Sequence, residues 1–338
     1  MKKRTKTNQV VEETKNKPLF FVFTCVKEGR PFIKRLFDSL IKQTKKNFVH
    51  FIYEDGSKDS ICDLIEEYKK RVSQSNSPYE VIYEYNPRNI GLNRSTSYCI
   101  NKCNCPYFIW IDCDNWVDEH FFEELEKQVK RRSNDIVFRT NTLMIDDKTL
   151  KPVLLKRKIP KIDKHPLLDI VFRFYKYSFF AVNYNMLTKV CKKIELIDDK
   201  RFFNDKQVLF LASHINDTFS YTKRALGSAL IRVDSEYLSN KEEELDLKFD
   251  DLLNNYDIKP KYNYKELEQA KIYSKESYKC YEKKMYNEAI ELLIKKRRLL
   301  KKNDVPYWHL YLGGCDFKRL FFYKALILLE RLKKCLKK

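Results

Sequence analysis

The sequence predicts an α/β domain with a mainly parallel sheet and helices on both faces, followed by a C-terminal α-helical extension. Three observations predict this fold class. Apolar segments of strand length alternate with segments of helical spacing between residues 19 and 139. Acidic clusters directly follow two of the apolar segments. From residue 263 onward the spacing of apolar residues is helical only. Alternating strands and helices are typical of βαβ units, and therefore of a parallel sheet.

Each predicted strand is a short run rich in aromatic and β-branched residues. The five strands are Leu19–Cys25, Val49–Tyr53, Tyr79–Tyr85, Tyr107–Ile111 and Asp135–Arg139. The segments between them repeat apolar residues every three or four positions, as Ile33, Leu36 and Phe37 do in the first one. Helices are therefore predicted at Pro31–Thr44, Ser60–Val72, Leu92–Lys102 and Val117–Arg132.

The pattern is less regular between residues 142 and 200, where Asp146–Lys148 is suited to a hairpin turn. A further helix is predicted at Phe202–Ser213 and a late strand at Leu226–Val233. This organisation predicts four parts. They are a mobile basic arm at 1–17, the main domain at 18–235, a linker at 236–262 and the helical extension at 263–338.

The helical extension contains two features with alternative interpretations. Tyr278–Tyr281 and Met285–Ile290 resemble one tetratricopeptide-type hairpin, but about three such units are needed for a self-supporting stack. A helical appendage packed on the main domain is therefore favoured. Residues 317–338 form a basic amphipathic helix with eight basic residues and one acidic residue. We expect this helix to lie on an anionic membrane surface; the alternative is a terminal helix docked on the protein's own core.

Composition limits the classes of partner and compartment. The chain carries 67 basic and 47 acidic residues, a net charge of +20, which favours an anionic partner. Nucleic acid is not expected, because no RRM, KH, zinc-finger or helix-turn-helix pattern is present. Ten cysteines occur without a secretory leader or a long apolar segment. We therefore expect free thiols in a reducing, cytoplasmic compartment, with the protein peripheral on the inner face of the membrane.

Two acidic clusters follow predicted strands. Glu54–Asp59 follows the second strand, and Asp112–Asn115 follows the fourth. Because ligands of open α/β sheets bind at the carboxyl ends of strands, these carboxylates are expected around one crevice. Asp112 and Asp114 form an Asp-x-Asp pair of hard oxygen ligands, suited to Mn²⁺ or Mg²⁺ that bridges a diphosphate.

Four ordered motifs give the chain a family resemblance. They are Ser39–Thr44 ending in Gln-Thr, Glu54–Ser57 in place of Asp-Asp-Gly-Ser, the Asn89–Gly91 turn, and Asp112–Asp114 at the family's usual spacing of 21 residues after Gly91. With them, residues 19–115 resemble the nucleotide-binding half of a family 2 glycosyltransferase with the GT-A fold. A weaker likeness extends to about residue 235.

The resemblance implies a role for each matched residue. The residues expected to bind the nucleotide sugar are Thr24, Cys25, Glu28, Glu54, Asp55, Arg94, Asp112 and Cys113. Asp114 and Asp112 would hold the metal, with His214 as a weaker third candidate. Asp205, in Asn204-Asp205 where the family has Glu-Asp, would be the catalytic base of an inverting displacement. Trp116 would lie on the acceptor side, or simply cap the sheet.

For several cysteines in this region a structural role is the alternative to a functional one. Cys99, Cys103, Cys105 and Cys113 lack the paired spacing of a zinc site and are better explained as buried small side chains. The hypothesis from sequence is a metal-dependent inverting transferase. It would move a sugar, expected from a UDP-sugar, to a hydroxyl of a cell-surface polysaccharide or lipid-linked saccharide. The alternative is a non-catalytic GT-A scaffold that binds a partner through its helical region.

Overall fold

The computed structural model describes residues 17–153, 166–171, 179–198, 204–231, 249–305 and 323–328. The predicted basic arm, apart from its last residue, lies outside these ranges. The chain divides into two compact units, one of Met1–Leu167 with Tyr175–Glu244, and one of Leu168–Phe174 with Leu245–Lys338. No helix among the described residues is both long and apolar enough to cross a membrane.

The first unit is built on one mixed sheet. Its strands are β1 (Phe20–Val26), β2 (Phe48–Asp55), β3 (Val81–Asn86), β4 (Tyr107–Trp110), β5 (Trp116–Val117), β6 (Val137–Asp146), β7 (Phe180–Asn183) and β8 (Phe219–Ile231). They lie in the order β3-β2-β1-β4-β7-β6-β8-β5. The pairs of β1 with β2 and β4, of β2 with β3, and of β6 with β8 are parallel. Strands β7 and β5 run antiparallel to their neighbours. The prediction of a mainly parallel sheet is confirmed.

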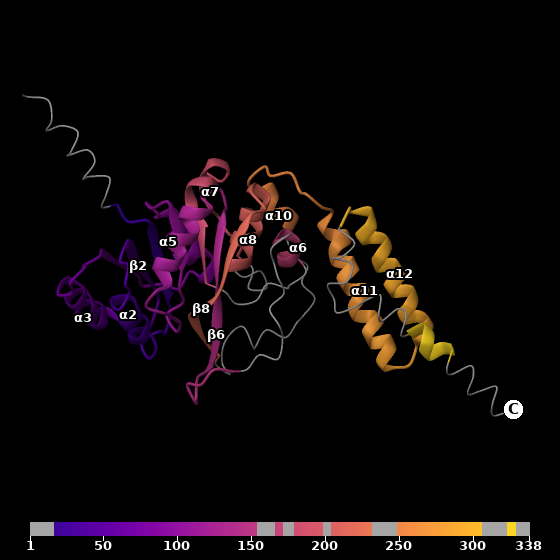
Figure 1. The fold of residues 1–338 in the computed structure, drawn as a ribbon, viewed down its shortest axis with the longest axis horizontal. Coiled ribbons are helices and arrows are strands. Elements are labelled where there is room, and N and C mark those ends of the chain that lie inside the picture. Colours follow the sequence, from indigo (N-terminus) through magenta and orange to yellow (C-terminus); the bar gives the residue numbers. More distant parts are fainter. Residues whose placement is uncertain are drawn as a thin grey trace, which may run out of the picture. The chain divides into compact units, whose positions relative to one another are not determined.

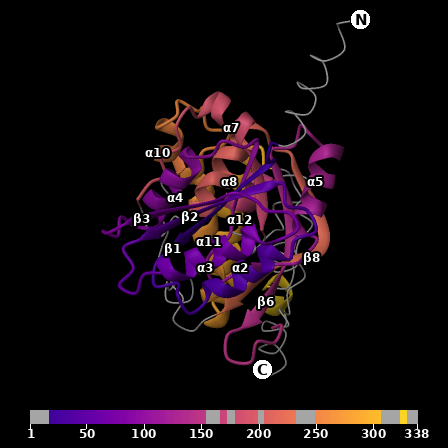
Figure 2. The ribbon, with the colours of Figure 1, turned by 90° about the vertical axis from the view of Figure 1, so that its left-hand side faces the viewer.

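Helices cover both faces of this sheet. They are α2 (Ile33–Ile41), α3 (Cys62–Ser73), α4 (Leu92–Asn101), α5 (Phe121–Arg131), α7 (Tyr184–Val190) and α8 (Asn204–Ile215), and α6 (Pro166–Val171) spans the boundary between the units. All five helices predicted before residue 215 are present, with ends that differ by a few residues. Figure 2 shows α2 and α3 on one side of β1 and β2, and α4 on the other.

The later strands differ most from the prediction. Strand β8 begins at Phe219, seven residues before the predicted start, because its polar first half is held by parallel pairing with β6. Strands β5 and β7 were not predicted, since two- and four-residue strands have too little pattern of their own. The predicted hairpin turn after β6 is present: Asp146 accepts hydrogen bonds from the backbone and hydroxyl of Thr149, both at 2.8 Å.

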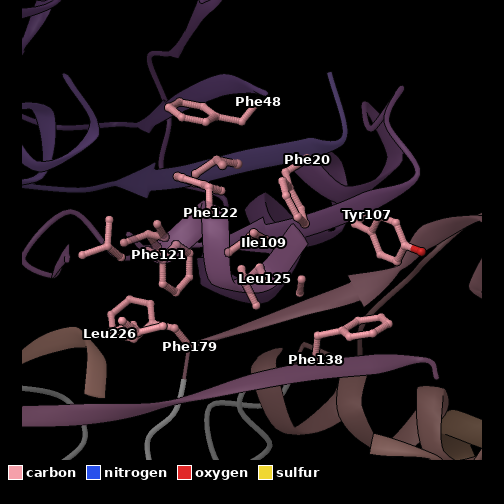
Figure 3. Packing of buried hydrophobic residues seen from close by; sticks show 14 of the residues in the cluster. Phe20, Phe48, Tyr107, Ile109, Phe121, Phe122, Leu125, Phe138, Phe179 and Leu226 are labelled. Atoms are coloured by element: carbon pink, nitrogen blue, oxygen red, sulfur yellow. The ribbon is translucent and has the colours of Figure 1, made fainter. Parts of the chain in front are cut away.

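The core of the first unit is aromatic. In β1, alternate side chains face opposite ways, so that Phe20 and Val22 pack with Leu36 of α2 and Phe122 of α5. Figure 3 shows Phe20, Phe48 and Phe122 gathered in this cluster. The ring centroids of Phe48 and Phe122 are 4.3 Å apart. This packing holds β1, β2 and β4 in register, and so places the loops that follow them.

The second unit is helical. Its elements are α10 (Phe249–Asn254), α11 (Tyr264–Glu282), α12 (Tyr286–Lys302) and a helical segment at 323–328. Helices α11 and α12 form an antiparallel hairpin (Figure 1), tied by the hydrogen bond from Ser277 Oγ to the Ala289 carbonyl at 2.9 Å. The linker predicted at 236–262 is corrected in part. It contains α10, because Phe249, Leu252 and Leu253 recur on one helical face and are buried.

The described part of the predicted terminal basic helix, 323–328, has both a buried and an exposed apolar residue: Leu328 is 62% exposed. Tyr323 was assigned to the apolar face that would meet a membrane, but only 2% of it is exposed. It packs with Ala289 and Leu293 of α12, and its ring stacks on Tyr281 at 5.0 Å. Part of that apolar face is therefore already covered by the helical hairpin. Residues 317–322 and 329–338 lie outside the described residues, so the predicted membrane contact of this segment stays a prediction.

Candidate active site

The strand order places a switch point beside β4. The chain runs from β1 outward to β2 and β3, then returns to β4 on the other side of β1. Crevices outside the carboxyl ends of strands form at such points and are where ligands bind in open α/β sheets. Asp112 and Asp114 follow β4, so this edge of the sheet is the candidate active site.

Three carboxylates converge at this edge. Negative charges on Asp114 and Asp205 both raise the pKa of Asp112, so the start of α8 lies within electrostatic range of the residues after β4. Asn115 steadies Asp112, donating from its side-chain amide to Asp112 Oδ2 at 3.2 Å and from its backbone to the Asp112 carbonyl at 3.0 Å. Residues 93 positions apart in the sequence thus form one anionic cluster.

The pKa values of this cluster reflect incomplete hydration and mutual repulsion. Desolvation by surrounding protein, and then the charges of Asp114 and Asp205, raise the pKa of Asp112 to about 7. Solvent nevertheless reaches the Asp112 side chain, so screening weakens the effect and its direction is the informative part. Desolvation also raises the pKa of Asp205. A cation or a proton-donating substrate would relieve this repulsion.

The start of α8 is held by polar contacts that position Asp205. Asn204 donates to Thr96 Oγ1 at 2.8 Å, which ties α8 to α4. The side-chain amide of Gln207 pairs with both backbone groups of Ile197, at 2.8 and 3.0 Å. Asn204 stands where the family has Glu, and in this chain it acts as a structural tether.

A polar ladder on α4 escaped the sequence analysis. Asn93, Ser97 and Asn101 recur every fourth residue, on one face of the helix. Asn93 donates to the Ile197 carbonyl at 2.9 Å, Ser97 accepts from Leu196 N at 2.9 Å, and Asn101 donates to the Ile194 carbonyl at 2.7 Å. The spacing of these polar residues was the available signal. The ladder fixes the segment that leads to α8.

Asp55 holds the Asn-Ile-Gly turn. Its Oδ1 accepts from Ile90 N at 2.9 Å, and its Oδ2 accepts from Gly91 N at 3.1 Å and Ser95 Oγ at 2.8 Å. Only 5% of Asp55 is exposed. The residue expected to contact the nucleobase therefore organises the loop at the start of α4, and Ser95 is a second residue that sequence analysis missed.

Gly56 is required by the close approach of this turn to β2. Its φ is +68°, and a Cβ on it would lie 2.4 Å from Asn89 N. We expect Gly56→Ala to lower the free energy of unfolding by more than about 2 kcal/mol, because both the backbone angle and the contact become strained. Urea unfolding measures this. Ser57→Ala, in the same loop without either strain, should cost only about 1 kcal/mol; an equal loss in both variants would contradict the argument.

Glu54 and Glu28 support the same loop from two sides. Glu54 is fully buried, and its carboxylate accepts from Ile61 N at 3.2 Å, from Ser60 Oγ at 3.1 Å and from the Tyr83 hydroxyl. Glu28 Oε1 accepts from Lys58 N at 3.1 Å. Both residues, expected near the nucleotide, make contacts that shape the loop after β2.

The residues at the end of β1 face opposite sides of the sheet. Thr24 is fully buried, and its hydroxyl donates to the Ile111 carbonyl at 2.8 Å and lies 3.2 Å from His50 Nε2. Cys25 faces α4, with its Sγ 3.7 Å from Cys99 Sγ. Cys113 packs beside Gly29, where an added Cβ would meet its Sγ at 2.7 Å. Of these three, only Cys25 and Cys113 are partly accessible.

Two predicted ligand contacts are engaged by protein partners. Arg94 Nη2 lies 3.0 Å from Asp198 Oδ2, and both side chains are more than half exposed. The Arg35 guanidinium lies over the Trp116 ring, 4.5 Å from its centroid. An exposed ion pair such as the first is weak enough for a charged ligand to replace it. Trp116 lies on β5, opposite Ser228 of β8.

His214 does not join the carboxylate cluster. It lies nine residues after Asp205 on α8, or about 14 Å along the helix, and its Nδ1 is 2.9 Å from the Phe210 carbonyl. Its role as a metal ligand stays a prediction. Cys99, Cys103 and Cys105 are buried free thiols, as the sequence predicted. The described residues contain no group of three or more His, Cys, Asp or Glu side chains that could hold a metal ion by themselves.

The mixed sheet with helices on both faces is consistent with the GT-A fold. Residues 21–183 match the family model described as glycosyl transferase family 2. TarS residues 1–349 of S. aureus, in complex with UDP-GlcNAc, superpose with a TM-score of 0.57 at 14% sequence identity, covering 92% of each chain. At that identity the likeness shows the fold alone.

Two relatives with assigned names match shorter segments. The glycosyltransferase GlyA of Streptococcus pneumoniae serotype 4 is 26% identical over 105 residues, which is 31% of this chain and 14% of GlyA. The processive diacylglycerol beta-glycosyltransferase of Mycoplasma genitalium is 26% identical over 113 residues, 33% of this chain and 32% of that protein. This chain therefore aligns with no more than a third of either relative.

Proposed function

We propose that the protein is an inverting glycosyltransferase that moves a sugar from a nucleotide-diphosphate donor, of the UDP-sugar class, to a hydroxyl of a saccharide or glycolipid. The observation that carries this proposal is the action of the Asp205 charge on Asp112. This effect supports a site in which the α8 carboxylate would accept a proton and the Asp-x-Asp pair after β4 would bind the diphosphate.

Asp205 is proposed as the base. A sugar hydroxyl is a poor nucleophile, and a carboxylate within hydrogen-bond reach accelerates its attack by about 10²–10⁴-fold by accepting its proton. Desolvation raises the pKa of Asp205, which makes its carboxylate a stronger base than one in water. One base on the face opposite the leaving group is the arrangement for a single displacement with inversion.

The residues fit a divalent cation, Mn²⁺ or Mg²⁺, bound together with the donor. Asp112 and Asp114 supply hard oxygen ligands, and the repulsion that raises the pKa of Asp112 would be relieved by a cation beside it. Two carboxylates alone leave coordination positions for the donor's phosphates and water. A bound cation would stabilise the negative charge of the leaving diphosphate. Arg94 would exchange its contact with Asp198 for that diphosphate.

A panel of nucleotide sugars with Mn²⁺ tests the donor class. We expect hydrolysis of at least one UDP-sugar without acceptor. EDTA should abolish this turnover, and added Mn²⁺ or Mg²⁺ should restore it, because the proposed site has too few protein ligands to retain the cation. Release of free UDP is the measurement. Undiminished turnover in EDTA would contradict the metal assignment, whereas no turnover with any donor would favour the scaffold alternative.

Acceptor and location are part of the proposal. A likeness to a processive diacylglycerol beta-glycosyltransferase supports a lipid-linked acceptor, and a cell-surface saccharide is proposed beside it. Such an acceptor is consistent with peripheral placement on the cytoplasmic side of a membrane. A non-catalytic scaffold remains the alternative, and the convergence of Asp112, Asp114 and Asp205 argues against it, because a scaffold has no need of mutually repelling carboxylates.

A further inference from the structure

The outward face of α12 carries exposed cations. Buried residues of this helix, among them Leu293 and Leu300, lie on one side. Exposed basic residues lie around the remaining surface of its second half, from Arg297 beside the buried side to Arg298 opposite it. We call these four the α12 basic face: Lys295, Arg297, Arg298 and Lys301. Throughout the described part of the chain, none of the four forms an ion pair or a side-chain hydrogen bond.

The charge on this segment is not balanced within the fold. Residues 294–302 contain six basic residues and no acidic one over about 12 Å of helix. Lys302 reaches Glu266, and Lys296 is buried with its Nζ 3.3 Å from Ser274 Oγ. The other four are the exposed residues of the α12 basic face. Like charges three or four residues apart, such as Arg297 and Lys301, repel each other and weaken the helix. An external anionic surface would remove this repulsion.

The chemistry of the face favours lipid over nucleic acid. Ile294 is 39% exposed and lies on the same side as Arg298 and Lys301. An apolar side chain surrounded by long basic side chains fits the boundary of headgroups and acyl chains, where Lys and Arg extend toward the phosphates. No aromatic side chain that could stack on bases is exposed on α12. We propose that the α12 basic face docks the helical unit on an anionic lipid surface.

This proposal moves the membrane contact from the chain terminus to α12. Residues 317–338 were expected to supply it, yet Tyr323 is buried against α12 and Tyr281. Lipid binding does not depend on the proposed transferase activity, because it is measured without donor. Donor hydrolysis is measured on the same samples. Failure of the lipid-binding proposal can then be distinguished from failure of the proposed transferase activity.

The test is co-sedimentation of the full chain with phosphatidylcholine vesicles, with and without about 30 mol% phosphatidylglycerol, at about 0.15 M salt. The variant replaces the four residues of the α12 basic face by Gln. The control makes the same change of net charge at four exposed lysines elsewhere: Lys42, Lys45, Lys192 and Lys259. We expect at least a roughly tenfold loss of partitioning in the α12 variant and less than about twofold in the control.

A second variant tests the contact without removing charge. In Ile294→Trp, the fluorescence of the added tryptophan is the variant spectrum minus the wild-type spectrum. This fluorescence should shift to the blue when anionic vesicles are added, and should not shift with phosphatidylcholine alone. Unchanged binding of the α12 variant, or equal losses in variant and control, would overturn the proposal. The proposal would also be overturned if the protein bound a DNA duplex more tightly than anionic vesicles and the α12 substitutions abolished that DNA binding. The face would then be a nucleic-acid site.

Discussion

Asp205→Asn is expected to slow sugar transfer by about 10²-fold or more, a barrier increase of roughly 3 kcal/mol. The substitution keeps the size of the side chain and removes its ability to accept a proton. Donor affinity should change little, because the base acts on the acceptor hydroxyl. A loss of rate with binding retained identifies an interaction made in the transition state. Initial rates and UDP binding by calorimetry are the two measurements.

Asp198→Asn is the matched control for Asp205→Asn. Asp198 is the nearest described carboxylate upstream, and it contacts Arg94 while more than half exposed. We expect transfer to fall by less than about tenfold in this variant, since an exposed ion pair contributes little. Full activity of Asp205→Asn, or a larger loss in Asp198→Asn, would remove Asp205 from the role of base. Equal loss of UDP binding in Asp205→Asn would show a disrupted site.

The pH profile of transfer gives an independent check on Asp205. A base must be deprotonated, and desolvation raises the pKa of Asp205 above its ordinary value. Activity is therefore expected to fall with decreasing pH before an ordinary aspartate would protonate. The acidic limb of kcat should disappear in the residual activity of Asp205→Asn. A limb that persists unchanged would belong to another group.

Asp112→Asn is expected to lower transfer by about 10²-fold, through loss of a charged ligand for the cation and diphosphate. The same change should stabilise the protein in EDTA at alkaline pH. The folded-state pKa of Asp112, about 7, lies above its ordinary value of 3.8, so its contribution to stability is fully present below pH 3.8 and is lost progressively as pH rises from there to about 7.

Thermal unfolding in EDTA measures the effect on stability. At pH 8.5 we expect a gain of about 1 kcal/mol after allowing for the solvent that reaches Asp112, or roughly 2–4 °C in Tm. At pH 5.5 we expect a smaller gain than at pH 8.5, because the penalty develops progressively between the ordinary pKa of 3.8 and the folded-state pKa of about 7. Asp118→Asn, an exposed carboxylate nearby in sequence, is the control. A destabilised Asp112→Asn at pH 8.5 would contradict the repulsion.

Residues near the nucleotide show how far sequence motifs predict a site. The motifs located Asp55, Asp112, Asp114 and Asp205 correctly on strand ends and on a helix start. They could not show that both Asp55 oxygens are engaged by the Asn-Ile-Gly turn, because a motif records residue type and not hydrogen-bond partners. Helical rise separates His214 from Asp205 by about 14 Å along α8, a distance that a motif does not record.

Strands with a strong pattern of their own were predictable from the sequence, and the remaining strands were not. The apolar runs of β1 and β2 are recognisable in the sequence because both faces of a central parallel strand are covered and must be apolar. Strand β5 forms by pairing with β8, and β7 forms by pairing with β4 and β6. These partner strands are far away in the sequence. Local composition carries no record of such partners.

The sequence by itself determined the α/β class and the acidic residues that follow two of the parallel strands. It also determined the helical character of the C-terminal region and its excess of positive charge. Only the tertiary structure decided that Asp205 acts on Asp112, that Asn93, Ser97 and Asn101 hold the approach to α8, and that Tyr323 is covered. The physical reason is range. Apolar periodicity and charge are properties of neighbouring residues, whereas electrostatic coupling and burial depend on segments that the chain brings together only when it folds.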